Sequence, residues 1–275
     1  MDHSGRPPQP EVSVLMPVHN AARFLKPAIE SILSQSFKDF ELNIVDDGST
    51  DDSADIIAAY AEKDPRIRVL RLDVNRGIVQ ALNAGLALCR GEFVARMDAD
   101  DVALPDRLAD QVKKMTENPA IAALGGAVTY IDADGKELGL IRRCNVHASP
   151  LAGSPLLHPT VILRRSLLSE HHLQYHEQYR YAEDYFLWLE LQPYGLLDAL
   201  ESVVIQYRIT ESASRRKFLK PMLRAALRVK RDAILKLGIK PKFSDLVRMS
   251  AESLLLLMPT RLVWWLYNRI NRLSI

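Results

Sequence analysis

The chain has 275 residues, of which 48% are apolar and 25% are charged, a composition that is typical of a soluble globular protein. Its length fits one large domain, or one domain with an extension. The two cysteines, Cys89 and Cys144, have no CxxC spacing, which argues against a zinc site and against a disulfide framework.

The two ends of the chain differ from its body. Residues 215–275 contain 15 lysines and arginines but 3 acidic residues, whereas residues 1–214 contain 21 basic and 31 acidic residues. We therefore expect an acidic body and a basic C-terminal segment with a partner of its own. The N-terminus, MDHSGRPPQP, lacks the apolar core of a secretory signal, so we expect residues 1–10 to be disordered and the protein to be cytoplasmic.

The N-terminal part of the chain alternates between strands and helices. Strands are predicted at residues 11–17, 40–45, 68–72 and 92–97. Helices are predicted at residues 21–34, after DDGSTDDS with Asp52 or Ser53 as N-cap, and over NRGIVQALNAGLALCRG with Gly91 as C-cap. This alternation predicts an α/β fold in which helices cover both faces of a parallel sheet through right-handed crossovers.

Polar clusters follow three of these predicted strands. They occupy residues 17–20, 46–49 and 98–101. Because the carboxyl ends of parallel strands meet at one edge, we expect these clusters to share one rim. Ligands of such sheets bind at this rim, so it is the candidate site.

Beyond residue 105 the predicted elements are mixed. PDRLADQVKKMTEN is predicted to be a helix with Pro105 in its first turn, so that Asp106 lies inside the helix. Residues 121–131 and 136–142 are predicted to form a hairpin around DADG. Further predictions are a strand at residues 158–163, a helix at residues 182–191 and a strand at residues 203–209.

The acidic residues of this rim have two possible interpretations each. Asp98 and Asp100 form a DxD whose hard oxygens suit Mg²⁺ or Mn²⁺, although a lone DxD is more often a solvated turn. Asp101 is predicted to cap the next helix. Asp46 and Asp47 precede Gly48 and Ser49, which favours either an Asx-turn or a site for a base or ribose.

A second acidic pair opens the predicted helix at residues 182–191. Glu183 and Asp184 either compensate the helix dipole or supply a general base, since a helix N-terminus favours the ionised carboxylate. Arg208 and the run SASRRK at residues 212–217 either contact phosphate oxygens or are solvated.

The motifs together resemble those of family 2 glycosyltransferases with the GT-A fold. The matching stretches occur in the expected order over residues 11–217. They are VSVLMPVHN, SILSQSFKDFELNIVDDGSTDDS, NRGIVQALNAGL, GEFVARMDADDVALPDRLADQ, LLHPTVILRRSLL, YAEDYFLWLEL and YRITESASRRK. The resemblance is strongest to bacterial transferases that build lipopolysaccharide, exopolysaccharide or capsule, and it implies a Rossmann-like, mostly parallel sheet.

The resemblance implies an inverting, metal-dependent transfer from a nucleotide-diphosphate sugar, most often UDP-linked, to a glycan or lipid-linked acceptor. It implies that Asp184 is the catalytic base and that Asp100 is the ligand of Mn²⁺ or Mg²⁺. The implied donor contacts are Pro17 and His19 at the base, Asp47 at the base with Asp46 supporting its turn, and Asp98 at the ribose or a metal-bound water. Position 19 is aromatic or Asn in many relatives.

The resemblance also implies weaker contacts to phosphate or acceptor. His158 either contacts the acceptor or metal or is a structural histidine, and Glu183 lies beside the base. Arg208, Ser214 and Arg215 are implied to close over the diphosphate.

The basic segment, residues 218–275, is predicted to be an amphipathic helical extension. Its apolar stretches are broken by PTR and are too short for a confident spanning helix. Tryptophans beside basic residues favour a helix lying in a membrane interface, and thus a peripheral position on the cytoplasmic face of the inner membrane. A helical hairpin packed on the catalytic domain and a dimer contact are the alternatives. Its apolar content argues against nucleic acid as a partner.

Two rival functions remain. A nucleotidyltransferase also uses an α/β sheet and acidic metal ligands, but it is expected to carry a Gly-rich loop where this chain has PVHNAARF. A nucleotide-sugar-binding module without turnover is the other, and the joint presence of Asp47, Asp98, Asp100 and Asp184 argues against it.

Overall fold

The computed structural model describes residues 9–209 and 213–271, and its side chains over residues 9–209 and 218–266. The expected disorder of residues 1–10 falls almost wholly outside the described residues.

The first half of the chain forms the parallel part of one sheet. Its strands are β1 (Val12–Val18), β2 (Phe40–Asp47), β3 (Ile67–Leu72) and β4 (Phe93–Arg96), which lie in the order β3-β2-β1-β4. The connections pass through α1 (Ala22–Leu33), α2 (Ser53–Ala61) and α3 (Ile78–Leu88). The predicted alternation of strands and helices is confirmed here.

The second half extends the sheet with mixed directions. Next to β4 lie in turn β8 (Ile162–Arg164), β6 (Ile121–Ile131), β9 (Leu196–Arg208) and β5 (Val102–Ala103). β4–β8 and β8–β6 are antiparallel, whereas β6–β9 is parallel. The predicted hairpin is confirmed, because β7 (Glu137–Arg142) pairs antiparallel with β6. The sheet is thus parallel from β3 to β4 and mixed beyond.

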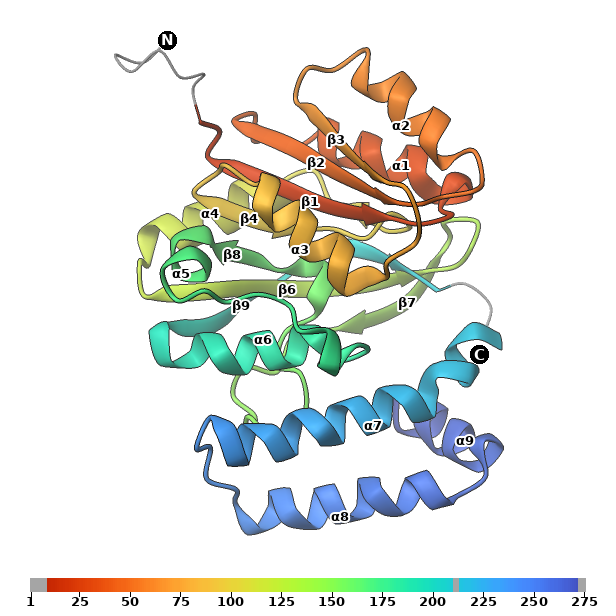
Figure 1. Ribbon diagram of the computed structural model, residues 1–275, viewed down its shortest axis with the longest axis vertical. Helices are drawn as coiled ribbons and strands as arrows, with labels where there is room; N and C mark the ends of the chain where they lie inside the picture. The colour runs from red at the N-terminus through yellow and green to blue at the C-terminus, as the bar shows by residue number, and fades with distance from the viewer. Residues whose placement is uncertain (1–8, 210–212, 272–275) are drawn as a thin grey trace.

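Helices cover both faces of this sheet (Figure 1). α1, α2 and α4 (Arg107–Glu117) pack on one face, and α3, α5 (Arg165–Glu170) and α6 (Glu183–Leu191) pack on the other. The alternation within β1 explains this: Val14 and Met16 join the first apolar cluster, whereas Leu15 joins the second. Every residue of β1 is buried, as expected of a strand covered on both faces.

Several predicted boundaries are wrong. α3 ends with Cys89 as its C-cap, and Gly91 instead lies against β1, where a Cβ would come 2.6 Å from the Ser13 amide nitrogen. α4 begins at Arg107 with Asp106 at the N-cap, so Asp106 lies at the start of the helix and not inside it. β2 continues through Asp47, and β9 begins at Leu196, earlier than residue 203.

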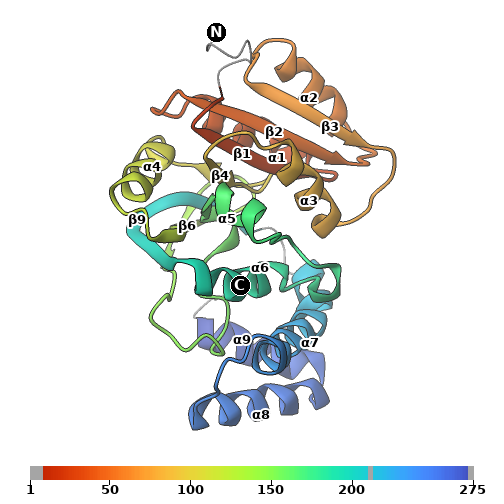
Figure 2. The same ribbon diagram turned by 60° about the vertical axis from the view of Figure 1, so that its left-hand side comes forward.

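The C-terminal helices form a separate layer under α6 (Figures 1 and 2). They are α7 (Ala213–Lys236), α8 (Phe243–Leu257) and α9 (Thr260–Asn271). α7 packs on the outer side of α6 through Val229 and Ala233, which meet Tyr179 and Phe186. Among the described residues, no helix has the length and apolar content needed to cross a membrane.

Gly48, in the turn after β2, provides a test of this packing. Gly48 (φ +64°) and Gly139 (φ +66°) share a left-handed backbone, but a Cβ on Gly48 would lie 2.6 Å from the Asn75 nitrogen, whereas Gly139 has nothing within 4 Å. We expect Gly139→Ala to cost about 1 kcal/mol of unfolding free energy from backbone strain. Gly48→Ala should cost about 2–4 kcal/mol, because the clash adds to that strain. Urea denaturation measures both, and equal losses would contradict the packing described here.

Candidate active site

The three polar clusters meet at the carboxyl ends of β2, β1 and β4. Val18 at the end of β1 is in register with Asp46, and Leu15 is in register with Arg96 of β4. His19, Asp47 and Asp98 therefore leave one edge of the sheet, as the topology predicted.

Asp46 and Asp47 both fix the loop at this edge. Asp46 Oδ1 accepts a hydrogen bond from the Ser49 amide at 3.0 Å, which makes the Asx-turn, and its other oxygen lies 3.5 Å from Arg71 Nε. The two oxygens of Asp47 accept from the amides of Arg76 at 2.7 Å and Gly77 at 2.8 Å. Asp47 thus ties the end of β2 to the N-terminus of α3, and each of its oxygens keeps one lone pair.

His19 is held over the same turn. Its Nδ1 donates to the Asp47 carbonyl oxygen at 2.8 Å, while its side chain is exposed. Asn20, at φ 51°, accepts from the Thr50 amide at 2.8 Å and fixes the chain as it leaves β1. Pro17 is buried within β1, so it reaches the rim through its backbone neighbours rather than through an exposed ring.

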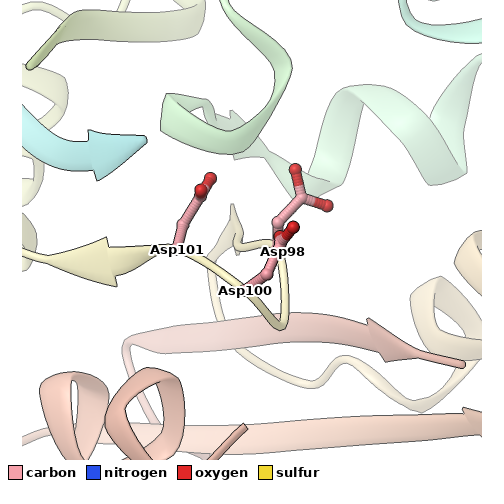
Figure 3. A group of neighbouring side chains, drawn as sticks. All are labelled: Asp98, Asp100 and Asp101. Carbon is pink, nitrogen blue, oxygen red and sulfur yellow. The ribbon is translucent and has the colours of Figure 1, made fainter. Parts of the chain in front are cut away.

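Asp98, Asp100 and Asp101 gather in the loop between β4 and β5 (Figure 3). Each contributes one carboxylate oxygen to a group whose members lie within 4.8 Å of one another. The predicted helix cap at Asp101 is wrong: its Oδ1 accepts from the Arg208 amide of β9 at 2.8 Å. Its Oδ2 is buried and has no hydrogen-bond partner, so it remains available to a cation.

Arg96, at the end of β4, is a functional residue that the sequence analysis missed. Its guanidinium is buried and its Nη2 lies 2.5 Å from Asp98 Oδ1. Burial lowers the pKa of Arg96, but the charge of Asp98 outweighs burial, so the pKa is raised overall. In the motif VARMDADD, Arg96 precedes Asp98 by two positions, and this spacing is the signal in the sequence that points to the ion pair.

Two acids of the cluster, Asp100 and Asp101, resist ionisation. Burial, and then the charge of Asp98, raise the pKa of Asp100 to about 6. The same two causes raise the pKa of Asp101 well above its ordinary value. The charges of Arg96 and Arg208 favour the ionised form of Asp100, but they do not offset burial and the charge of Asp98. A hard divalent cation such as Mg²⁺ or Mn²⁺ fits this set of oxygens and would supply the missing charge.

Arg208, predicted to contact phosphate, braces the acidic loop. Its Nε donates to the Asp100 carbonyl at 2.7 Å, and its Nη1 donates to the carbonyls of Asp132 at 2.9 Å and Ala133 at 3.2 Å. Its guanidinium also lies over the Phe24 ring, 4.8 Å from the centroid. The side chains of Ser214 and Arg215 lie outside the described residues.

Glu183 and Asp184 open α6, as predicted, but their environments differ. Ser154 Oγ donates to Asp184 Oδ2 at 3.3 Å, and burial raises the pKa of Asp184. Glu183 is buried with an unpartnered Oε2, and burial followed by the charge of Asp184 raises its pKa to about 7. Tyr181, just before the pair, has φ 79°, a strained conformation of the kind found at functional sites.

His158 is a partnered histidine beside this pair. Its Nε2 lies 3.0 Å from the Tyr175 hydroxyl, and its ring meets the edge of Trp188. Burial, and then Arg96, lower its pKa well below the ordinary value, so the imidazole is neutral. These contacts support the structural interpretation of His158.

Arg96 connects the two acidic groups. Its charge acts on Asp98, Asp100 and Asp101, and it also favours the ionised forms of Glu183 and Asp184. The acidic loop after β4 and the first turn of α6 therefore surround one buried cation. This arrangement brings three carboxylates whose oxygens suit a hard cation to the same region as a carboxylate that could accept a proton.

Replacing Arg96 tests how strongly the surrounding carboxylates depend on its charge. Arg96→Met leaves buried carboxylates without their cation, and breaking such a pair costs about 3–5 kcal/mol. We expect that loss in metal-free protein at neutral pH, with a smaller loss for Arg96→Lys, which keeps the charge. Protonation of the carboxylates should reduce the loss at acidic pH. Urea denaturation at both pH values measures it, and a loss independent of pH would argue against electrostatic coupling.

Asp100 predicts a second pH dependence. Its pKa in the folded state, about 6, lies above its ordinary value of 3.8, so its ionisation destabilises metal-free protein as pH rises through this interval. Asp100→Asn should therefore gain stability over wild type between pH 4 and pH 7, by at most about 3 kcal/mol. Denaturation in the presence of a chelator measures the difference, with Asp106→Asn as the exposed control. A constant difference across this range would refute the shift.

Comparison with known proteins agrees with the site. Residues 13–168 match the family model described as Glycosyl transferase family 2. The amylovoran biosynthesis glycosyltransferase AmsE of Erwinia amylovora is 34% identical over 190 residues, which cover 66% of this chain and 70% of that protein.

Solved structures show the same fold. TarS 1–349 of S. aureus in complex with UDP-GlcNAc has a TM-score of 0.62 and 21% identity, over 80% of this chain and 66% of that chain, just under two thirds. The mannosyltransferase PcManGT from Pyrobaculum calidifontis, in complex with GDP-Man and Mn²⁺, has a TM-score of 0.56 and 20% identity, over 94% of this chain and 83% of that chain. The chain therefore belongs to glycosyltransferase family 2, has the GT-A fold, and is a glycosyltransferase.

Proposed function

We propose that the protein is an inverting, metal-dependent glycosyltransferase that moves a sugar from a nucleotide-diphosphate donor to a hydroxyl of a glycan or lipid-linked acceptor. The observation that carries this proposal is the pair of acidic groups around Arg96: a three-carboxylate edge on the β4 loop and Asp184 on α6. A donor bound at the strand ends would have its diphosphate leaving group at the three-carboxylate edge. The acceptor hydroxyl would then lie at Asp184.

The donor is proposed to be a UDP-sugar held at the ends of β1, β2 and β4. TarS binds UDP-GlcNAc and PcManGT binds GDP-Man, which supports a nucleotide sugar on this fold. His19 and the free lone pairs of Asp47 face the base, with Pro17 and Asp46 supporting the turn around them. Asp98 is assigned to the ribose or to a metal-bound water, and its ion pair with Arg96 fixes its carboxylate.

The metal is proposed to be held by Asp100, with the unpartnered oxygen of Asp101 next to it. Bound Mn²⁺ or Mg²⁺ supplies positive charge for the departing diphosphate. The Arg208 guanidinium donates to the carbonyl oxygen of Asp100, and the Arg208 amide donates to the carboxylate of Asp101, so Arg208 keeps both acidic residues in place as charge builds nearby. Its role toward the diphosphate is thus indirect.

Asp184 is proposed as the catalytic base. It accepts the proton of the acceptor hydroxyl while that oxygen attacks the anomeric carbon, and the bond to the diphosphate oxygen breaks on the opposite face, which inverts the configuration. Arg96 and the N-terminus of α6 favour its ionised form. Glu183 is less suited, because its side chain is buried, whereas the Asp184 side chain is half-buried and can be reached by an acceptor.

The rival functions have less support. A nucleotidyltransferase needs a Gly-rich phosphate loop, but β1 is followed by His19 and Asn20, which bind the turn after β2. A binding module without turnover has no use for a carboxylate such as Asp184 beside Arg96. Family membership also favours sugar transfer.

The cellular role is proposed to be bacterial cell-surface polysaccharide synthesis. The name of AmsE, an amylovoran biosynthesis glycosyltransferase, supports it. We assign catalysis to residues 11–217 and a peripheral contact with the cytoplasmic face of the inner membrane to residues 218–275, which would bring the enzyme to a lipid-linked acceptor. The basic charge of that extension supports this placement.

Asp184→Asn tests the mechanism directly. We expect kcat to fall by about 10²–10⁴-fold, because the amide cannot accept the proton, while binding of the donor with Mn²⁺ survives. Asp100→Ala should instead weaken metal-dependent binding of the donor. Nucleotide release and calorimetry with a panel of nucleotide sugars separate the two effects.

Asp106→Asn is the matched control, since Asp106 is an exposed carboxylate outside the site. Near-normal turnover by Asp184→Asn would remove the base assignment. Equal donor binding by Asp100→Ala and wild type with Mn²⁺ would remove the metal assignment.

A further inference from the structure

The outer side of α8 carries an apolar stripe in contact with solvent. Its residues recur at helical spacing, and each is between 46% and 82% exposed. They are Phe243, Leu246, Val247, Leu254 and Leu257. An exposed apolar face of this length on a surface helix is a mark of an interaction site.

The inner side of α8 holds the helix in this orientation. Asp245 is buried, and its Oδ2 accepts from Ser149 Oγ at 2.8 Å and from the Lys242 amide at 2.9 Å. Glu252 pairs with Lys230 of α7 at 2.6 Å. The acidic residues of α8 thus face the protein, whereas the five apolar residues of the stripe face outward.

The surroundings of the stripe are positively charged. Over residues 218–266, each acidic side chain is turned inward or paired, because Asp232 is buried between Arg231 and Lys236 in the same way. Exposed basic residues flank the stripe at its start, on its side and beyond its end. They are Lys240, Lys242, Arg248 and Arg261.

We propose that this face of α8 is a docking surface for an anionic lipid bilayer, on which the helix lies flat. The proposal deepens the membrane contact of the proposed function and rests on it for its purpose. A helix of 15 residues is about 22 Å long, shorter than the roughly 30 Å hydrocarbon core, so it cannot span. An apolar face flanked by basic residues is the pattern of a helix in the headgroup region.

Charge favours a bilayer over a second copy of the chain. Two copies joined through α8 would bring their basic flanks together, and the side chains described over residues 218–266 offer no outward-facing, unpaired acid to balance them. Anionic headgroups supply that balance, and each basic residue near such a surface adds to the attraction. On the neighbouring α9, Leu262 and Trp265 are also exposed, 43% and 52%, and extend the apolar area.

Vesicle flotation of the full chain tests the proposal. Wild type should float with vesicles of phosphatidylcholine and phosphatidylglycerol, and far less with phosphatidylcholine alone or at high salt. Phe243→Ser, Leu254→Ser and Leu257→Ser combined should reduce the bound fraction at least tenfold, and these positions are exposed enough to leave folding intact. Lys240→Gln with Arg261→Gln should weaken the preference for anionic vesicles, because only Lys242 and Arg248 of the four flanking basic residues remain.

The matched control replaces three exposed apolar residues outside the extension, Val74, Ile141 and Leu196, with serine, and it should float like wild type. Equal flotation of the wild type and the α8 triple variant would overturn the proposal. The proposal would also be overturned if light scattering showed that the wild type is a dimer, that the triple variant is not, and that the wild type does not bind vesicles.

A soluble assay separates this proposal from the proposed function. The α8 triple variant should keep its nucleotide release from a soluble donor, whereas Asp184→Asn should keep its vesicle binding. If the wild type transferred sugar but did not bind vesicles, the docking surface alone would be refuted. Vesicle binding without any transfer would refute the proposed reaction alone.

Discussion

The site depends on one ion pair, between the buried Arg96 and the half-buried Asp98 at the end of β4. A guanidinium buried among carboxylates keeps its charge because acids surround it, and those acids stay in place because the cation is there. Arg96 also faces Glu183 and Asp184, so the loop after β4 and the first turn of α6 share one electrostatic centre. The remaining contacts of the rim hold this centre in shape.

Those contacts come from segments far apart in the chain. Asp47 binds the amides of Arg76 and Gly77, Asp101 binds the amide of Arg208, and Arg208 returns to the carbonyl of Asp100. Each is a side chain of one rim segment bonded to the backbone of another. A loop that is fixed through its backbone can present its carboxylates in one geometry. The site then needs less reorganisation when charge develops in the transition state.

The sequence was sufficient for the parallel half of the fold and for the shared rim, because β1 is a mostly apolar run, β2 alternates apolar with polar residues, and a polar cluster lies at the end of each. It was insufficient where a residue's partner comes from a distant segment. Asp101 looked like a helix cap because Pro105 follows it, yet its partner is β9, 107 positions away. Arg96 lies in a stretch that reads as an apolar strand. Its interaction with Glu183 and Asp184 becomes visible only when α6 is placed in the fold.

The stacking of α6, α7 and α8 has a consequence for reach. Asp184 stands on α6, α7 packs on α6, and Lys230 and Glu252 join α7 to α8. Packed helices lie about 8–10 Å apart, so two such spacings place the axis of α6 at most about 20 Å above that of α8. An enzyme resting on a bilayer through α8 would hold its base at a fixed height, and the acceptor hydroxyl would have to extend that far from the lipid. The helical layer would then act as a ruler that selects acceptors by the length of their glycan.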